Sequence, residues 1–206
     1  NVFIAEGVVI GERVEILPGS FIGAGSIIAE DVKIFPNVTI YENVRIGARS
    51  RIHSGSVIGA DGFGYNYHQG VHEKVWHTGC VIMGEDVEVG SLSNIDSGTF
   101  GPTRIGSGTK LDSQVMVAHN CQVGRGVILC GQVGLAGSSI VKDFVVIGGD
   151  ACIAPGVEVG AGAQVAGLSG VTGNVAPGEK VGGHPARPLK EWLRSMAVLR
   201  KLTTKA

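Results

Sequence analysis

Large aromatic side chains are scarce in this chain. Phe, Trp and Tyr make up 5 % of its 206 residues, although 44 % of the residues are hydrophobic and 34 are glycine. A core with this composition cannot be anchored by a few large rings. It favours many thin, repeated layers of small and branched aliphatic side chains.

Charge imbalance and long apolar runs are also missing. The formal net charge is −1, which gives no global electrostatic reason to expect a nucleic-acid partner. No run approaches the roughly 18 consecutive apolar residues that a membrane span needs, and the first residues show no basic segment followed by an apolar one. We therefore expect a cytoplasmic protein without a transmembrane segment.

The cysteines form no recognisable metal or disulfide pattern. They include no CxxC pair, and no His lies at metal-ligand spacing from them. Reduced, buried thiols are the expected state. The four residues are Cys80, Cys121, Cys130 and Cys152.

What the chain does have is a six-residue repeat. Ten isoleucines follow one another at intervals of six, from Ile4 to Ile58, and a small or branched residue follows four places after each of the first nine. A second register of twelve aliphatic residues runs from Ile105 to Val171 with the same spacing. A period of six is neither 3.6 nor a multiple of seven, so it excludes a helix, and ordinary hairpin strands would be longer.

Short strands separated by turns every six residues predict a parallel β-solenoid. Each strand would pair with its equivalents in the coils above and below, around a column of stacked Ile and Val side chains. We place this all-β domain at residues 1–176, with a loop excursion at about 63–80 and a smaller insertion around Phe100. A long excursion with aromatic content is more often functional than idle.

The remaining segment, 177–206, predicts a turn followed by an amphipathic helix that begins at Pro188. Such a helix would cap the open edge of the last coil. Its charges sum to 5 − 1 = +4, counted over Lys190, Glu191, Arg194, Arg200, Lys201 and Lys205. A solvated face is the simpler interpretation of these charges, and a docking patch for an acidic carrier protein is the alternative.

His119 is the candidate for chemistry. It lies two residues after the inward Val117, so it should point outward at a turn. Gly137 follows 18 residues later. The isoleucine ladder resembles the hexapeptide-repeat acyltransferases, whose coils hold three hexads, and this resemblance implies that Gly137 lies one full coil on, beside His119. A neutral imidazole next to an accessible backbone N–H offers a proton acceptor and an oxyanion donor, the two parts that acyl transfer needs. A solvated surface histidine is the alternative interpretation.

Several motifs give the chain a family resemblance. Residues 117–124 (VAHNCQVG) resemble the segment of the lipid A acyltransferases that carries their general base. The segments 59–65 (GADGFGY), 136–138 (AGS), 147–149 (IGG) and 182–188 (GGHPARP), with Trp192, narrow the resemblance to the UDP-3-O-acylglucosamine N-acyltransferases. The resemblance implies that the solenoid is a left-handed parallel β-helix with a triangular section.

The resemblance also implies an activity and an assembly. The family forms homotrimers with active sites in the clefts between subunits. Its members transfer a 3-hydroxyacyl chain from the phosphopantetheine of acyl carrier protein to the 2-amino group of a UDP-3-O-acylglucosamine. No permanently bound cofactor and no metal are expected.

Carried over to this chain, the family's residue roles make His119 the general base and the Gly137 N–H the oxyanion donor. Asp112 and Asn120 match positions near the base. Gly62, Phe63 and Tyr65 are expected to contact substrate, although Phe63 and Tyr65 could instead pin the base of the loop.

The chain departs from the family at four positions and at its start. Ser97, Ser113 and Met116 replace residues usual in the family, and Gly156 stands where a second His is expected. The N-terminal uridine-binding domain has no counterpart, which indicates either a trimmed protein or a short relative.

Three other functions stay open from the sequence. The first is a sugar acetyltransferase that uses acetyl-CoA or another acyl-CoA. The second is a carbonic anhydrase of the γ class, although His53, His72, His77 and His119 lack the paired spacing of its metal ligands. The third is an inactive trimeric scaffold.

Overall fold

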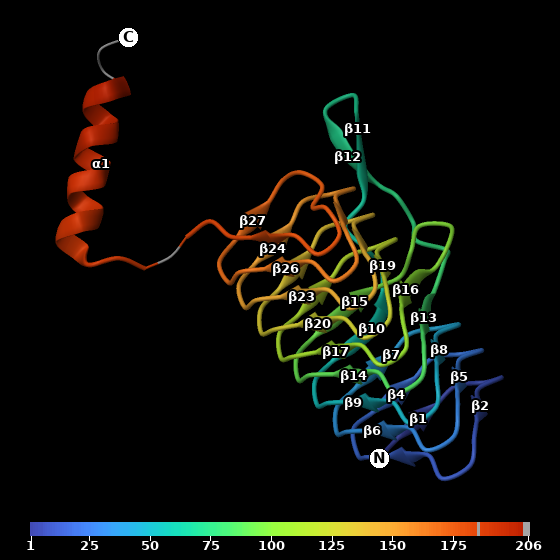
Figure 1. Cartoon of the computed structure of the whole chain (residues 1–206). Helices are drawn as coiled ribbons and strands as arrows, with labels where there is room; N and C mark the ends of the chain where they lie inside the picture. Colours follow the sequence, from blue (N-terminus) through green and yellow to red (C-terminus); the bar gives the residue numbers. More distant parts are fainter. Residues whose placement is uncertain (185, 204–206) are drawn as a thin grey trace.

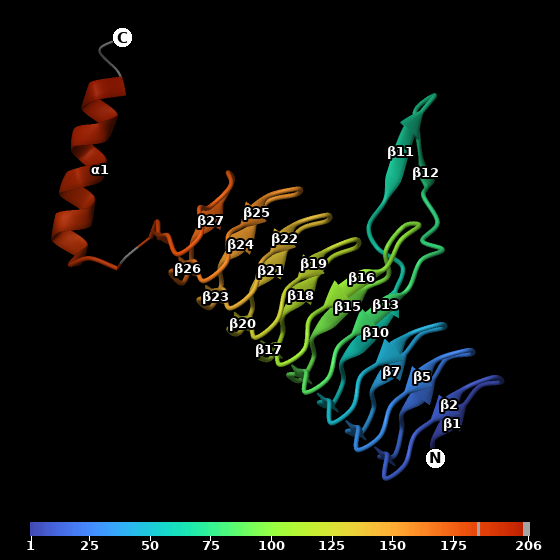
Figure 2. The same cartoon turned by 45° about the vertical axis from the view of Figure 1, so that its right-hand side comes forward.

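The chain winds into a parallel β-helix with three faces, and Figures 1 and 2 show its stacked coils. A computed structural model describes residues 1–184 and 186–203. Pro185 of the predicted turn, and residues 204–206 with Lys205, lie outside the described residues.

Each face is a sheet whose strands pair in parallel, coil upon coil. The first face holds β1 (Phe3–Ile4), β4 (Phe21–Ile22), β7 (Thr39–Ile40), β10 (Val57–Ala60), β15 (Asn94–Asp96), β18 (Met116–Val117), β21 (Gly134–Leu135), β24 (Cys152–Ile153) and β27 (Gly170–Val171). The second holds β2 (Val9–Ile10), β5 (Ile27–Ile28), β8 (Arg45–Ile46), β13 (Val81–Met83), β16 (Thr103–Ile105), β19 (Gln122–Val123), β22 (Ile140–Val141) and β25 (Glu158–Val159). The third holds β3 (Glu15–Ile16), β6 (Lys33–Ile34), β9 (Arg51–Ile52), β14 (Glu88–Val89), β17 (Lys110–Leu111), β20 (Ile128–Leu129), β23 (Val146–Ile147), β26 (Gln164–Val165) and β28 (Lys180–Val181).

The repeated aliphatic residues fill the inside of this prism, so the predicted left-handed β-helix fold is confirmed. Ile22 and Ile58 are fully buried, and Ile95 and Val117 continue the same column. The isoleucine column is less covered at its beginning, because the first coil has a neighbour on one side only. Ile4 is accordingly 46 % exposed.

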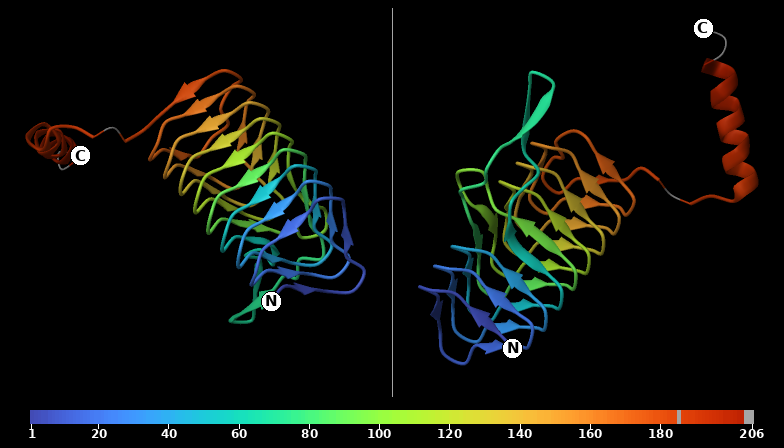
Figure 3. Two further views of the ribbon diagram at one scale, coloured as in Figure 1. Left: turned by 90° about the horizontal axis from the view of Figure 1, so that it is seen from below. Right: turned by 180° about the vertical axis from the view of Figure 1, so that it is seen from behind.

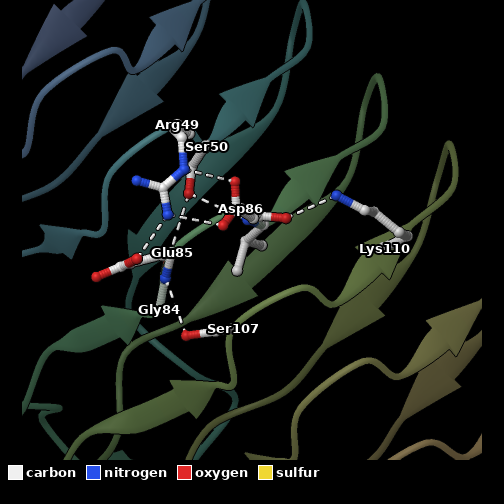
Figure 4. A network of polar contacts seen from close by, with 8 residues as sticks. Arg49, Ser50, Gly84, Glu85, Asp86, Ser107 and Lys110 are labelled. Atoms are coloured by element: carbon white, nitrogen blue, oxygen red, sulfur yellow. Dashed lines mark hydrogen bonds and ion pairs between the residues drawn. The ribbon is translucent and has the colours of Figure 1, made fainter.

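The corners are tight turns that require a left-handed backbone at one position. Asparagine tolerates that conformation better than most residues, and Asn37 (φ 60°) and Asn43 (φ 58°) occupy it. Ion pairs join the corners of successive coils. Figure 4 shows Arg49 bound to Glu85 and Asp86, whose backbone carbonyl accepts a hydrogen bond from Lys110. The Arg49 hydrogen bond lowers the pKa of Asp86.

The predicted loop excursion is a β-hairpin. β11 (Tyr65–His68) pairs antiparallel with β12 (Val71–Lys74), and the hairpin projects from the side of the prism (Figure 1). The third face also continues past the predicted end of the β-helix at residue 176, because β28 pairs with β26.

The predicted C-terminal helix is present as α1 (Leu189–Thr203), but it does not cap the last coil in the single chain. Figure 3 shows α1 standing away from the prism, and its Trp192 and Leu193 are about half exposed, at 47 % and 51 %. The last coil is formed by Val175, which bridges to Val159 and is 6 % exposed, and by β28, which pairs with β26. Among the described residues, no helix is long and apolar enough to cross a membrane.

Candidate active site

His119 lies at the corner between the first and second faces. β18 ends at Val117, which points inward, and β19 begins at Gln122, so His119 falls in the turn and points outward. Its carbonyl accepts a hydrogen bond of 2.9 Å from the Ser138 N–H in the next coil. The repeat therefore holds the backbone of His119 as firmly as it holds the core.

Gly137 lies directly against the His119 ring. A Cβ atom at position 137 would lie 2.6 Å from both Cε1 and Nε2 of His119, well inside van der Waals contact. Only glycine leaves room for the imidazole there. The Gly137 N–H has no acceptor among the described residues, and the residue that carries it lies against the Nε2–Cε1 edge of the ring.

Asn120 contacts the other edge of the same ring. Its Oδ1 lies 3.1 Å from His119 Nδ1 and also accepts hydrogen bonds from the N–H and the hydroxyl of Thr99, at 3.1 and 2.9 Å. The Asn120 N–H donates to Thr103 Oγ1 at 2.8 Å. Thr99 belongs to the small insertion that precedes β16, so this insertion rests on the candidate base.

The β11–β12 hairpin and the His119 corner enclose an open pocket of about 700 Å³. Phe63, Tyr65 and Val75 provide its apolar lining, and His119 and Thr99 provide polar atoms. Phe63 and Tyr65 meet edge to face with ring centroids 5.1 Å apart, and Phe63 is 85 % exposed. The two rings are thus available to a ligand, in agreement with the substrate-contact interpretation, although their role stays a prediction.

Gly62 allows the hairpin base to pack against His119. A Cβ at this position would lie 2.7 Å from His119 Cβ and 2.8 Å from His77 Nε2. Its carbonyl accepts a hydrogen bond of 2.8 Å from Lys74 Nζ. Gly62 therefore fits closely between two imidazole rings.

His77 is a site residue that the sequence interpretation underrated. Its ring meets His119 edge to face at 5.1 Å between centroids, and neither ring nitrogen has a hydrogen-bond partner in the described structure. Burial lowers the pKa of His77, and the nearby His119 lowers it further. The hairpin register could have revealed this position, because pairing Tyr65 with Lys74 and continuing three residues outward brings Gly62 opposite His77.

Asp96 is a second residue close to the candidate base. It is 4 % exposed at the end of β15 and accepts a 2.6 Å hydrogen bond from Asn94 Nδ2. Burial raises the pKa of this carboxyl, while the Asn94 hydrogen bond and the electrostatic influence of His119 oppose the shift. The six-residue period does not indicate this buried acid, which the charge of His119 influences.

Asp112 is not brought to this site within one chain. It lies at the corner between the third and first faces, in a separate groove of about 410 Å³ with His53, Glu88 and Lys110. Its Oδ1 accepts a hydrogen bond of 2.7 Å from the Ser113 N–H. The structure thus joins Asn120 and Gly62 to His119 and leaves Asp112 apart, and a role for Asp112 stays a prediction.

The titratable side chains of residues 1–184 and 186–203 offer no group of three or more that could hold a metal ion. His53 pairs instead with Glu88 at 3.0 Å. All four cysteines are free, and Cys121 is buried whereas Cys152 is exposed.

Comparison with protein families matches the chain to the bacterial transferase hexapeptide model of six repeats, at residues 25–60 and 102–137. The chain is 43 % identical over 160 residues to a UDP-3-O-acylglucosamine N-acyltransferase of Methylobacterium nodulans, and the match covers 78 % of this chain and 46 % of that protein. It is also 43 % identical over 171 residues to the Wolinella succinogenes protein of the same name, covering 82 % and 54 %. The chain thus spans about half the length of these curated relatives.

Solved structures give the same fold. The chain superimposes with a TM-score of 0.78 and 28 % identity on the UDP-N-acetylglucosamine acyltransferase of Campylobacter jejuni, over 85 % of this chain and 67 % of that one. The UDP-N-acetylglucosamine O-acyltransferase of Moraxella catarrhalis gives 0.80 and 26 %, over 95 % and 76 %.

The fold, the repeat and the outward histidine define a member of the hexapeptide-repeat acyltransferase superfamily. Within that superfamily, the chain is similar over most of its length to proteins named UDP-3-O-acylglucosamine N-acyltransferase, of which it spans about half. The resemblance drawn from the sequence motifs is confirmed.

Proposed function

We propose that this β-helix carries out acyl transfer to the 2-amino group of a UDP-3-O-acylglucosamine. The observation that carries the proposal is the His119 ring, which lies between an unpaired Gly137 N–H and an apolar pocket. The relatives' names supply the acceptor, and the site supplies the groups that such a reaction requires.

The reaction follows from these two groups. The acceptor amine attacks the carbonyl carbon of an acyl thioester, forming a C–N bond while His119 takes the proton from nitrogen. The carbonyl oxygen becomes an oxyanion, which the Gly137 N–H stabilises. Collapse of this intermediate breaks the C–S bond, and the proton held by His119 passes to the leaving thiolate.

The pocket favours a long acyl chain as the transferred group. Its volume of about 700 Å³ and its lining by Phe63, Tyr65 and Val75 suit an apolar chain better than an acetyl group. We therefore propose a 3-hydroxyacyl chain carried on the phosphopantetheine of acyl carrier protein as the donor, with acyl-CoA as the alternative.

A homotrimer completes the proposal. The outer sides of the first two faces carry exposed apolar residues, among them Val9, Phe21, Ile27 and Met116. Closed threefold packing of three-faced prisms would cover such residues. It would also bring a second chain to the open side of each pocket.

The test is an acyl-transfer assay read by mass spectrometry. The chain is incubated with UDP-3-O-acylglucosamine and either 3-hydroxyacyl carrier protein or acetyl-CoA, beside a His119→Ala control. The expected result is an N-acylated product from the carrier-protein donor that the control does not form. Product from acetyl-CoA alone, or equal turnover by the His119→Ala variant, would overturn the proposal.

A further inference from the structure

The insertion before β16 places Thr99 over Asn120. Two donors of Thr99 meet the same oxygen, its N–H at 3.1 Å and its hydroxyl at 2.9 Å from Asn120 Oδ1. Thr99 is itself held in place, since its carbonyl accepts hydrogen bonds from the Thr78 N–H at 2.8 Å and the Thr78 hydroxyl at 3.2 Å. The contact is therefore built into the loop.

These bonds fix the orientation of the Asn120 amide. A backbone N–H can only donate, so the amide atom that faces Thr99 must be the oxygen. Rotating the amide by half a turn would set its NH₂ group against the Thr99 N–H, and this partly buried donor would lose its acceptor. Thr99 thus decides which end of the Asn120 side chain points toward His119.

The amide orientation in turn decides the tautomer of His119. The Asn120 oxygen lies 3.1 Å from His119 Nδ1, and an oxygen acceptor there requires Nδ1 to carry the hydrogen. In a neutral imidazole the other nitrogen then keeps its lone pair. That nitrogen is Nε2, the atom that lies against Gly137.

We infer that Thr99 is a positioning residue: through Asn120 it holds His119 as the Nδ1–H tautomer, which leaves Nε2 free to accept a proton beside Gly137. The inference deepens the proposed acyl transfer and rests on it for the role of His119 as base. The tautomer itself is a property of the chain alone. It can be measured without substrate.

Two variants at position 99 separate positioning from general structure. Thr99→Pro removes the backbone N–H that fixes the amide, whereas Thr99→Ser keeps both donors. Thr172→Pro, at an exposed position near the end of the β-helix, is the matched control for the introduced proline. Circular dichroism checks that each variant keeps its β structure.

The first measurement is the ¹⁵N spectrum of the His119 ring at about pH 8, above the ordinary imidazole pKa. The wild type and Thr99→Ser are expected to show a proton-bearing Nδ1 and an unprotonated Nε2. Thr99→Pro should shift the tautomer ratio toward Nε2–H by about fivefold, the change that one neutral hydrogen bond supports. An Nε2–H tautomer in the wild type would overturn the inference.

The second measurement is steady-state acyl transfer. Thr99→Pro should lower kcat by about fivefold with KM nearly unchanged, and both Thr99→Ser and Thr172→Pro should match the wild type. A Thr99→Pro protein with the wild-type tautomer ratio and the wild-type kcat would refute the role of Thr99. The spectra need no substrate. A chain without transferase activity would therefore refute only the proposed reaction, and the measured tautomer of His119 would still test the inference.

Discussion

Replacing Gly137 with alanine tests the candidate site most directly, because the new methyl group must displace the His119 ring. The added Cβ would lie 2.6 Å from Cε1 and Nε2, and ordinary contact begins at 3.4 Å. The ring must therefore move by about 3.4 − 2.6 = 0.8 Å. His119 is only partly buried and faces an open pocket, so the ring can move there without disturbing the core.

The expected consequence is a loss of rate with little loss of stability. A misplacement of about 1 Å can cost 10²-fold in rate, which corresponds to about 2.7 kcal/mol in the activation free energy. Pushing the His119 side chain off its rotamer costs about 0.5–1.5 kcal/mol of folding free energy. The assay combines kcat/KM for acyl transfer with the free energy of unfolding in urea.

Gly170→Ala is the matched control for this substitution. Gly170 lies in β27 on the first face, and a Cβ added there meets nothing within 4 Å. It should keep the wild-type rate and stability. If Gly137→Ala also kept the wild-type kcat/KM, the proposed arrangement of base and oxyanion donor would be refuted.

Three further predictions concern the base, its neighbour and the core. His119→Ala should keep the β-helix and lose at least about 10²-fold in kcat, and unchanged turnover would dismiss His119 as the base. Because the folded-state pKa of His77 is lowered, its unfolded form binds more protons below about pH 6.5, and stability should fall as the pH drops from about 7 to 5. Thermal midpoints across that range should be flatter for His77→Gln than for the wild type and for His72→Gln, and equal slopes would contradict this. Ile95→Val should cost about 1 kcal/mol of unfolding free energy, whereas Ile4→Val, at 46 % exposure, should cost measurably less, and equal losses would argue against the inward column.

Some parts of this site follow from the period alone. In a three-faced coil, residues 18 apart occupy equivalent positions in adjacent turns, so the contact between His119 and Gly137 could be counted from the sequence. The parallel pairing of β18 with β21 fixes that register. Position 119 is outward for the same reason that Val117 is inward.

The neighbours supplied by the two insertions could not be counted in this way. His77 reaches His119 because the β11–β12 hairpin folds back on itself, and Thr99 reaches Asn120 because the short insertion bends over the corner. Both segments leave the six-residue period, so their partners depend on how they pack. Burial then lowers the pKa of His77.

For the C-terminal helix, too, the sequence predicted the element but not its position. Its apolar spacing predicted α1, and the helix is there, but the spacing did not say where it lies. The last coil ends with Val175 and β28, whereas the helix stands apart from it and Trp192 is half exposed.

The sequence by itself determined the β-helix, its inward column and the pairing of His119 with a glycine corner, because a period of six repeats the same local environment in every coil. Only the tertiary structure decided which side chains surround that histidine, because Gly62, His77, Thr99 and Asp96 reach it across long stretches of chain. The tertiary structure also decided that Asp112 faces a different groove. Asp112 and His119 are close in the sequence, but they lie at different corners of the three-faced prism.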